Sequence, residues 1–154
     1  MRIELQKKLV EKYPKIFSAY GGDPKVTCMA WGIECGDGWY NIIDSLCSCI
    51  TGYLGSANIK YNEKNELVDR SQEDPAYVHH VTAEQVKEKY GTLRFYYNGG
   101  NETTEAMVSL AERLSGVTCE ICGCKSEPPD DKSGWVHTLC EDCLIDSQRK
   151  DPNG

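Results

Sequence analysis

The sequence contains no long uninterrupted run of apolar residues. Its first 17 residues, MRIELQKKLVEKYPKIF, alternate charged with apolar side chains. A signal peptide needs a continuous apolar segment, and a membrane helix needs about 20 consecutive, predominantly apolar residues. We therefore expect neither a signal peptide nor a membrane span, and we expect the protein to lie in the cytoplasm.

Positive charge is scarce as well. The chain of 154 residues has 17 Lys and Arg against 24 Asp and Glu, which gives a formal net charge of -7. Affinity for nucleic acids comes mostly from Lys and Arg side chains that displace counterions from the phosphates. Direct binding to nucleic acid is therefore not expected.

Phosphate-binding glycine motifs are also missing. The sequence contains neither GxGxxG nor GxxxxGK followed by Ser or Thr. A short glycine pattern does occur at Gly36-Asp37-Gly38. We interpret this pattern as a turn in which Asp37 caps the following helix, and not as a phosphate-binding loop.

Cysteine, by contrast, is plentiful. The chain has nine cysteines, and five of them fall within the 26 residues 118–143. An odd number leaves at least one thiol unpaired in any monomeric disulfide scheme, and disulfides are rare in a reducing cytoplasm. We therefore interpret the cysteines as thiols or thiolates.

Apolar residues recur at helical spacing in three segments of the N-terminal part. Pro14 is expected to end or bend the first helix, Gly55 to end the second, and Gly116 to follow the third. In the third helix, Leu110 and Leu114 belong to the predicted apolar face. The predicted helices are residues 3–13, 37–54 and 106–114.

One segment has the alternating pattern of a β-strand. In TLRFYYN, residues 92–98, Leu93 and Phe95 alternate with other side chains, as in a strand with one buried face. Strand-like residues also occur at 57–61, followed by a turn, and at 77–81. We expect a small sheet that includes residues 92–98.

A capping-box pattern, TAEQ at residues 82–85, predicts a further short helix that runs through Tyr90 and is closed by Gly91. The fold class is therefore α+β, with about three helices around a small sheet, followed by a C-terminal module. We place an α+β domain in residues 1–116 and a cysteine module in residues 117–154.

The cysteine module carries the most specific pattern in the chain. Two C-x2-C pairs are separated by 17 residues, which suits a hairpin that brings both pairs around one tetrahedral zinc ion. Gly123 directly follows the second thiol and permits the tight turn that such a pair needs. The predicted zinc ligands are Cys119, Cys122, Cys140 and Cys143.

The rest of the module predicts a turn at residues 128–134, a short strand at 135–139 and a helix that opens with CEDCLIDSQRK. A knuckle, a hairpin and a helix that donates the last two ligands resemble the treble-clef family of zinc modules, with the zinc ribbon as the close alternative. Four thiolates fill a tetrahedron, so we expect one structural zinc ion per chain. Cys124 and His137 are alternative ligands, since either can replace a neighbour.

An enzymatic site is not expected. Treble-clef folds include His-Asn-His endonucleases, but residues 134–143 offer only His137 and lack the other side chains of such a site. A metal-dependent nuclease or hydrolase is therefore the least favoured function. His79 and His80 are adjacent on a predicted strand, where neighbouring side chains point to opposite faces, so we assign them a structural or surface role.

Four further cysteines lie in the N-terminal part, with spacings that match no common zinc knuckle. Free cysteine behaves as a small hydrophobic residue, so we expect these thiols in the core. One of them, Cys35, precedes a helix N-terminus that would stabilise a thiolate, but no partner histidine for a nucleophile is identifiable. These cysteines are Cys28, Cys35, Cys47 and Cys49.

Arg94 and Tyr96 on the predicted strand are candidates for binding a nucleotide-derived small molecule. The guanidinium would pair with an anion, and the tyrosine ring would stack on a base. In the structural alternative, the arginine pairs with an acid on a neighbouring strand and the aromatic rings fill the core.

Over most of its length the chain resembles a set of uncharacterised small phage and prophage proteins. The stretches that carry the resemblance are WGIECGDGWYNIIDSLCSCI, VKEKYGTLRFYYNGG, CEICG and GWVHTLCEDC. The resemblance supplies no catalytic residues, and it implies a bacterial cytoplasm and an accessory protein that acts on host machinery. The expected function is therefore a zinc-stabilised interaction protein, such as a phage-encoded inhibitor of a bacterial defence or transcription system.

The charge of the cysteine module indicates the kind of partner. Residues 117–154 contain four basic and eight acidic side chains, a net charge of -4, and a zinc ion with four thiolates makes it more negative. Complementary charge favours association. The expected partner is therefore a host protein with a cationic surface.

Overall fold

A computed structural model describes residues 1–127 and 136–150 of the chain. The described chain is an α+β protein with four α-helices, two short 3₁₀ helices and two small sheets, and this class agrees with the sequence prediction. The elements in chain order are α1 (Ile3–Lys12), η1 (Cys28–Trp31), β1 (Ile33–Glu34), η2 (Asp37–Trp39), α2 (Tyr40–Ala57), β2 (Ile59–Tyr61), β3 (Leu67–Asp69), β4 (Thr82–Lys89), β5 (Thr92–Asn98), α3 (Glu102–Ser115) and α4 (Glu141–Lys150).

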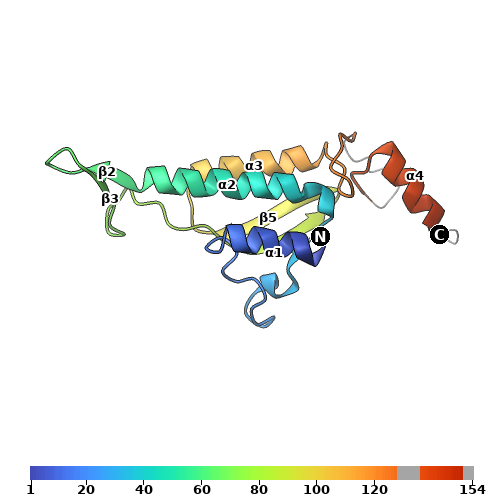
Figure 1. The fold of residues 1–154 in the computed structure, drawn as a ribbon, viewed down its shortest axis with the longest axis horizontal. Coiled ribbons are helices and arrows are strands. Elements are labelled where there is room, and N and C mark those ends of the chain that lie inside the picture. Colours follow the sequence, from blue (N-terminus) through green and yellow to red (C-terminus); the bar gives the residue numbers. More distant parts are fainter. Residues whose placement is uncertain (128–135, 151–154) are drawn as a thin grey trace.

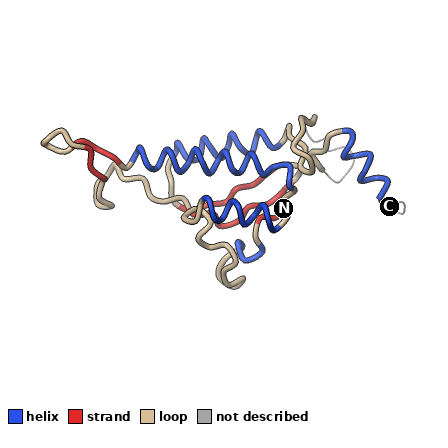
Figure 2. The backbone as a smooth tube through the Cα atoms, in the orientation of Figure 1, coloured by secondary structure: helices blue, strands red, loops and turns tan. Residues whose placement is uncertain are grey.

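The main sheet has three strands in the order β1-β4-β5, with β1 parallel to β4 and β4 antiparallel to β5. Helix α3 packs against both β5 and α2, so the two long helices run side by side along the molecule (Figures 1 and 2). Strands β2 and β3 form a separate antiparallel hairpin. Figure 1 places this hairpin and α4 at opposite ends of the long axis.

Helix α2 buries one face in the core, as its apolar spacing predicts. That face includes Trp39, just before the helix, and Ile43, Leu46, Cys47, Ile50 and Leu54. The predicted ends of the helix are wrong. The carboxylate of Asp37 does not cap α2, because it accepts hydrogen bonds from the backbone N–H of Arg2, at 2.7 Å, and from the Arg2 guanidinium. The helix also continues past Gly55 to Ala57.

The helix predicted from the TAEQ pattern is wrong, because this segment forms strand β4. A register shift between β4 and β5 follows Ala83. This bulge lets Ala83 and Val86 both be fully buried although they are three residues apart, a spacing that also fits a helix. Tyr90 and Gly91, with positive φ angles of 53° and 74°, form the tight turn into β5.

Helix α3 is present as predicted, but it buries a different face. Leu110 and Leu114, which the pattern placed in the core, are 59% and 47% exposed. The side chains that are buried instead are mostly small. They belong to Thr104, Val108, Ala111 and Ser115.

Polar contacts with strand β5 explain the orientation of α3. The Ser115 hydroxyl accepts a hydrogen bond from the backbone N–H of Leu93 at 2.8 Å, and the Glu112 carboxylate accepts one from the N–H of Phe95 at 3.0 Å. The helix must approach the strand closely to make both contacts, and small residues permit that approach. The predicted strand at residues 92–98 is confirmed, with Leu93 and Phe95 buried.

The polar segment after α2, whose sequence is compatible with a hairpin or a long loop, forms a hairpin in which Lys60 pairs with Val68. The strand predicted at residues 77–81 is absent. In the cysteine module, the turn predicted at 128–134 and the first residue of the strand predicted at 135–139 lie outside the described residues. Residues 136–139 form no strand.

Candidate metal centre

The structure brings four cysteine thiols together in the C-terminal part of the chain. The Sγ atoms all lie within 4.8 Å of one another, and those of Cys122 and Cys140 are 3.5 Å apart. Four sulfurs around one ion at a zinc–sulfur distance of about 2.3 Å are about 3.8 Å apart in a regular tetrahedron. The group therefore has the size and chemistry that a metal ion requires. Its members are Cys119, Cys122, Cys140 and Cys143.

The first two thiols lie on a short knuckle, residues 118–125, whose base is closed by an antiparallel bridge. The N–H of Cys119 donates to the carbonyl of Cys124 at 2.7 Å, and the N–H of Gly123 donates to the carbonyl of Cys119 at 2.9 Å. Gly123 has a φ of 77°, in the left-handed region that favours glycine. The turn predicted at Gly123 is therefore present.

The other two thiols come from the beginning of α4. Cys140 directly precedes the helix, and Cys143 lies in its first turn. The N–H of Leu144 donates to the carbonyl of Cys140 at 2.9 Å. The hydroxyl of Ser126 donates to the carbonyl of Leu139 at 2.7 Å, which joins the end of the knuckle to the segment that enters the helix. The last two thiols thus lie at a helix start, as the sequence predicts.

The thiols of the cluster differ in acidity. Burial raises the pKa of Cys119, but the backbone N–H groups of Cys122 and Cys140 outweigh this effect, and the pKa falls to about 6. Burial and the neighbouring thiols raise the pKa of Cys143. The cluster without metal thus favours one thiolate, at Cys119. A divalent ion would displace the remaining protons, because thiolates are the form that binds metals.

The knuckle rests on the turn at residues 36–38, the glycine pattern of the N-terminal part. The N–H of Gly38 donates to the carbonyl of Glu120 at 2.7 Å, and the N–H of Gly36 donates to the Glu120 carboxylate at 2.8 Å. A β-carbon on Gly38 would overlap the carbonyl oxygen of Cys119, and one on Gly36 would overlap the backbone of Glu120. Both positions therefore require glycine.

Further hydrogen bonds join the two parts of the chain. The indole N–H of Trp39 donates to the carbonyl of Thr118 at 2.7 Å. Thr138, which is fully buried, donates through its hydroxyl to the carbonyl of Gly91. The N–H of Glu120 donates to the carbonyl of Thr138 at 2.9 Å. The knuckle and the segment before α4 are therefore bonded to each other and to the N-terminal part.

Cys124 and His137, the alternative ligands, lie outside the group of four thiols. Cys124 is exposed, and its carbonyl oxygen takes part in the knuckle. His137 lies in the segment that leads into α4, near Glu120, whose carboxyl pKa is raised by burial. The four thiols thus form a complete set of ligands without either residue.

The four N-terminal cysteines form no second metal-binding group within the described residues. Burial raises the pKa of Cys35 to about 12 and also raises the pKa of Cys47, so both thiols stay protonated at neutral pH. These two lie in the core, as predicted, whereas Cys28 and Cys49 are exposed. Burial at Cys35 therefore outweighs any stabilisation of its thiolate by the nearby helix.

Arg94 and Tyr96 do not converge on a cleft. The Arg94 guanidinium donates to the Thr92 hydroxyl at 2.6 Å and lies 4.0 Å from the Glu112 carboxylate. The ammonium group of Lys87 lies 5.7 Å from the centre of the Tyr96 ring. Arg94 thus has the acidic partner of the structural alternative, although that acid lies on α3 and not on a strand.

No protein-family model, curated protein or solved structure matches this chain. Among the residues that the structure describes, no helix is both long enough and apolar enough to cross a membrane.

The sequence patterns predicted the four thiols but did not predict the contact between the knuckle and the turn at residues 36–38. No sequence motif marks Glu120 as a contact residue, and its hydrogen-bond partner Gly36 lies 84 residues earlier in the chain. The available signal was the pair of glycines before a buried tryptophan. That pattern predicts a turn, but it does not indicate which distant backbone the turn contacts.

Proposed function

We propose that this chain is a zinc-stabilised protein-interaction protein in which the metal has a structural role. The observation that carries the proposal is the group of four thiols, which the knuckle holds against the 36–38 turn. Four thiolates complete a tetrahedron and leave no position for water or substrate, unlike the three-ligand sites of zinc enzymes. Under this proposal the metal maintains the module, and the protein acts through its surface.

Zinc is the metal that the ligand set favours. Tetrahedral sets of four sulfurs bind zinc or iron, and two C-x2-C pairs are typical of structural zinc sites. We expect elemental analysis of the purified protein to find one zinc per chain, and X-ray absorption to find only sulfur in the first shell. An oxygen ligand in that shell, or iron in place of zinc, would contradict the proposal.

The surface that we propose for the partner is the α3 stripe, a set of exposed apolar side chains on α3 and in the segment that follows it. Leu110 and Leu114 are four residues apart and lie on the same face of α3, whereas Val117 and Ile121 follow the end of the helix, and Ile121 is 51% exposed. Exposed apolar patches mark interaction sites, because burying them releases water. The α3 stripe consists of Leu110, Leu114, Val117 and Ile121.

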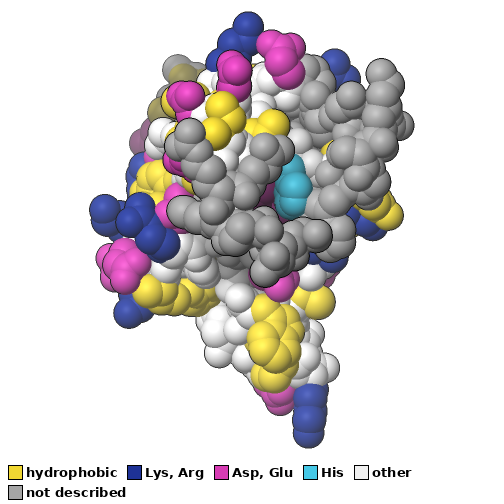
Figure 3. All heavy atoms as spheres, turned by 90° about the vertical axis from the view of Figure 1, so that its right-hand side faces the viewer, with side chains coloured by type: hydrophobic (Ala, Val, Ile, Leu, Met, Phe, Trp, Pro, Cys, Tyr) yellow, Lys and Arg dark blue, Asp and Glu magenta, His cyan; other side chains and the backbone are white. Residues whose placement is uncertain are grey.

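The charges around this end of the molecule favour a cationic partner. The module has four basic and eight acidic residues, and a zinc ion with four thiolates adds two further negative charges. Figure 3 shows hydrophobic side chains at the surface beside acidic ones on this end of the molecule. We therefore propose a partner with an apolar groove flanked by Lys or Arg.

The sequence resemblance extends the proposal to a biological setting. The resemblance implies that the partner is a bacterial host protein. More specifically, we propose that the chain is a phage-encoded inhibitor of a bacterial defence or transcription system. The likeness to phage and prophage proteins is what supports this step.

A tagged full-length chain tests the interaction in bacterial lysate. We expect capture of a stoichiometric host protein that is lost when Leu110→Glu and Leu114→Glu are combined. Ala106→Glu combined with Ser109→Glu is the matched control, because this pair also adds two negative charges at exposed positions of the same helix. Capture that survives the Leu110 and Leu114 substitutions, or that the control pair also abolishes, counts against the α3 stripe.

Two other functions have less support. A nucleotide site at Arg94 and Tyr96 is disfavoured because the guanidinium is already engaged by Thr92 and lies near Glu112. A metal-dependent hydrolase ranks last, because a fourth thiolate occupies the position that a catalytic water would need.

A further inference from the structure

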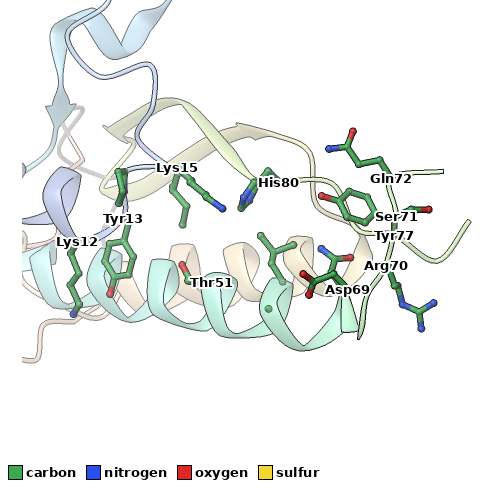
Figure 4. A pocket seen from close by; sticks show the side chains of 15 residues that line it. Lys12, Tyr13, Lys15, Thr51, Asp69, Arg70, Ser71, Gln72, Tyr77 and His80 are labelled. Atoms are coloured by element: carbon green, nitrogen blue, oxygen red, sulfur yellow. The ribbon is translucent and has the colours of Figure 1, made fainter. Parts of the chain in front are cut away.

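A cleft of about 690 Å³ lies between the C-terminal half of α2, the segment that follows α1 and the connection from β3 to β4. Figure 4 shows Lys15 and His80 on one side of this cleft, and Thr51 and Asp69 on the opposite side. Sites for small molecules typically measure about 300–1,000 Å³. The cleft shares no lining residue with the cysteine cluster or the α3 stripe.

Basic side chains outnumber acidic ones among the residues that line the cleft, unlike in the chain as a whole. The chain as a whole has a formal net charge of -7. The cleft, by contrast, is lined by three Lys or Arg side chains and one carboxylate, with a histidine in addition. These residues are Lys12, Lys15, Arg70, Asp69 and His80.

Two of the cations are already paired and help to shape the walls. The Lys12 ammonium lies 2.8 Å from the carboxylate of Asp44, and the Arg70 guanidinium lies 3.3 Å from that of Asp74. Arg70 also donates to the carbonyl of Ala57 at 3.1 Å, which ties the connection to the end of α2. These two side chains are therefore structural.

Lys15 and His80 are different, because neither forms a hydrogen bond or an ion pair with any described residue. Their side chains point toward one another across the upper wall (Figure 4). Burial and the charge of Lys15 lower the pKa of His80. An anion bound between them would pair with the Lys15 ammonium and raise the pKa of His80, so that the imidazole could donate a hydrogen bond to it.

The floor of the cleft is apolar, and Gly55 of α2 adds no side chain that would fill it. Tyr13, Ile16 and Leu54 line the cleft and are buried. Gly55 also lines it, and a β-carbon at this position would meet no atom within 4 Å. Glycine in a helix costs about 1 kcal/mol relative to alanine, and here it widens the cleft.

We propose that this cleft binds a small organic phosphate of mononucleotide size, with the phosphate between Lys15 and His80. A phosphate monoester suits a lysine ammonium beside an imidazole donor, because it carries up to two negative charges and three acceptor oxygens. The rest of the ligand lies over the apolar floor, and Asp69 on the opposite side accepts hydrogen bonds from its hydroxyl or amino groups. This inference is independent of the metal centre and of the α3 stripe.

Isothermal titration of the full-length, metal-loaded protein with AMP, GMP, CMP and UMP tests the proposal. We expect at least one of the four to bind with 1:1 stoichiometry, about tenfold or more tightly than inorganic phosphate or the matching nucleoside. Binding of inorganic phosphate as tight as that of the nucleotide contradicts the size argument. Absence of binding by all four nucleotides at about 1 mM overturns the proposal.

Three variants locate the site. Lys15→Ala and Gly55→Leu are each expected to weaken nucleotide binding by about tenfold or more, the first by removing a charge and the second by filling the cleft. Gly52→Leu is the matched control, because Gly52 lies on the same helix, has nothing within 4 Å of a β-carbon and does not line the cleft. Lys15 is exposed, so its substitution tests the site even where Gly55→Leu fails to fold. Unchanged affinity of Lys15→Ala, or equal losses in both glycine variants, overturns the assignment.

Discussion

The two parts of this chain are stabilised by different interactions. The apolar core is built from residues 9–111. Beyond residue 116, the described residues that are buried are Cys119, Ser126 and Thr138, and none of them belongs to that core. Burial of a large apolar side chain contributes about 1.5–3 kcal/mol, whereas binding of structural zinc provides on the order of 10 kcal/mol in small zinc modules. Under the proposed function, the module therefore depends on its metal as the N-terminal part depends on its core.

The junction between the two parts follows a third pattern. It includes hydrogen bonds from Gly36, Gly38 and Trp39 to the knuckle and from Thr138 to Gly91, and each such bond contributes about 1 kcal/mol. Under the proposed function, the metal stabilises the fold of the module, and these hydrogen bonds fix its position. Substitutions that remove the metal and substitutions that disturb the junction should therefore have different effects.

Loss of a ligand has the largest expected effect. Cys119→Ser removes the most acidic thiol of the cluster, and we expect the bound zinc to fall from one per chain to none, with unfolding of α4. The N-terminal part should keep its structure, because its core contains no module residue. Metal analysis and NMR spectra of the whole chain measure both outcomes.

Cys124→Ser is the matched control for that experiment, since Cys124 lies in the same knuckle and outside the group of four thiols. It should keep one zinc per chain. Full zinc content in Cys119→Ser would show that Cys124 or His137 replaces the lost ligand.

Gly38→Ala tests the junction and has an intermediate expected effect. The added methyl group would overlap the carbonyl oxygen of Cys119, so the knuckle must move. We expect a loss of about 2–3 kcal/mol in the free energy of unfolding, with zinc still bound. Denaturant unfolding and metal analysis of the same sample measure this.

Gly52→Ala provides the comparison for Gly38→Ala, because nothing lies within 4 Å of a β-carbon at Gly52. It should raise the free energy of unfolding by up to about 1 kcal/mol, since alanine favours the helix. If the two variants behave alike, the 36–38 turn is not a specific contact for the knuckle.

Trp39→Phe has the smallest expected effect. Phenylalanine retains most of the buried ring but cannot donate to the carbonyl of Thr118. We expect a loss of about 1 kcal/mol in the free energy of unfolding and faster amide hydrogen exchange in the knuckle. Exchange rates equal to those of the unmodified protein would show that this hydrogen bond does not hold the knuckle in place.

Local patterns in the sequence predicted those elements whose structure depends on near neighbours. The alternation around Leu93 and Phe95 predicted β5, and the two C-x2-C pairs predicted which thiols converge. The prediction failed where a distant contact decides the outcome. The bulge after Ala83 gives a strand the spacing of a helix, and the hydrogen bonds of Ser115 and Glu112 to β5 turn Leu110 outward. No local pattern records that Gly36 meets a glutamate 84 residues away.

The hydrogen bonds between α3 and β5 also determine how this sheet can meet other chains. A free strand edge is a template on which a foreign strand can align, in peptide recognition and in aggregation alike. Here the outer N–H groups of Leu93 and Phe95 are already bonded to Ser115 and Glu112, and the opposite edge strand, β1, has two residues. The main sheet is therefore protected against growth by strand addition, whereas the separate β2–β3 hairpin pairs only with itself among the described residues.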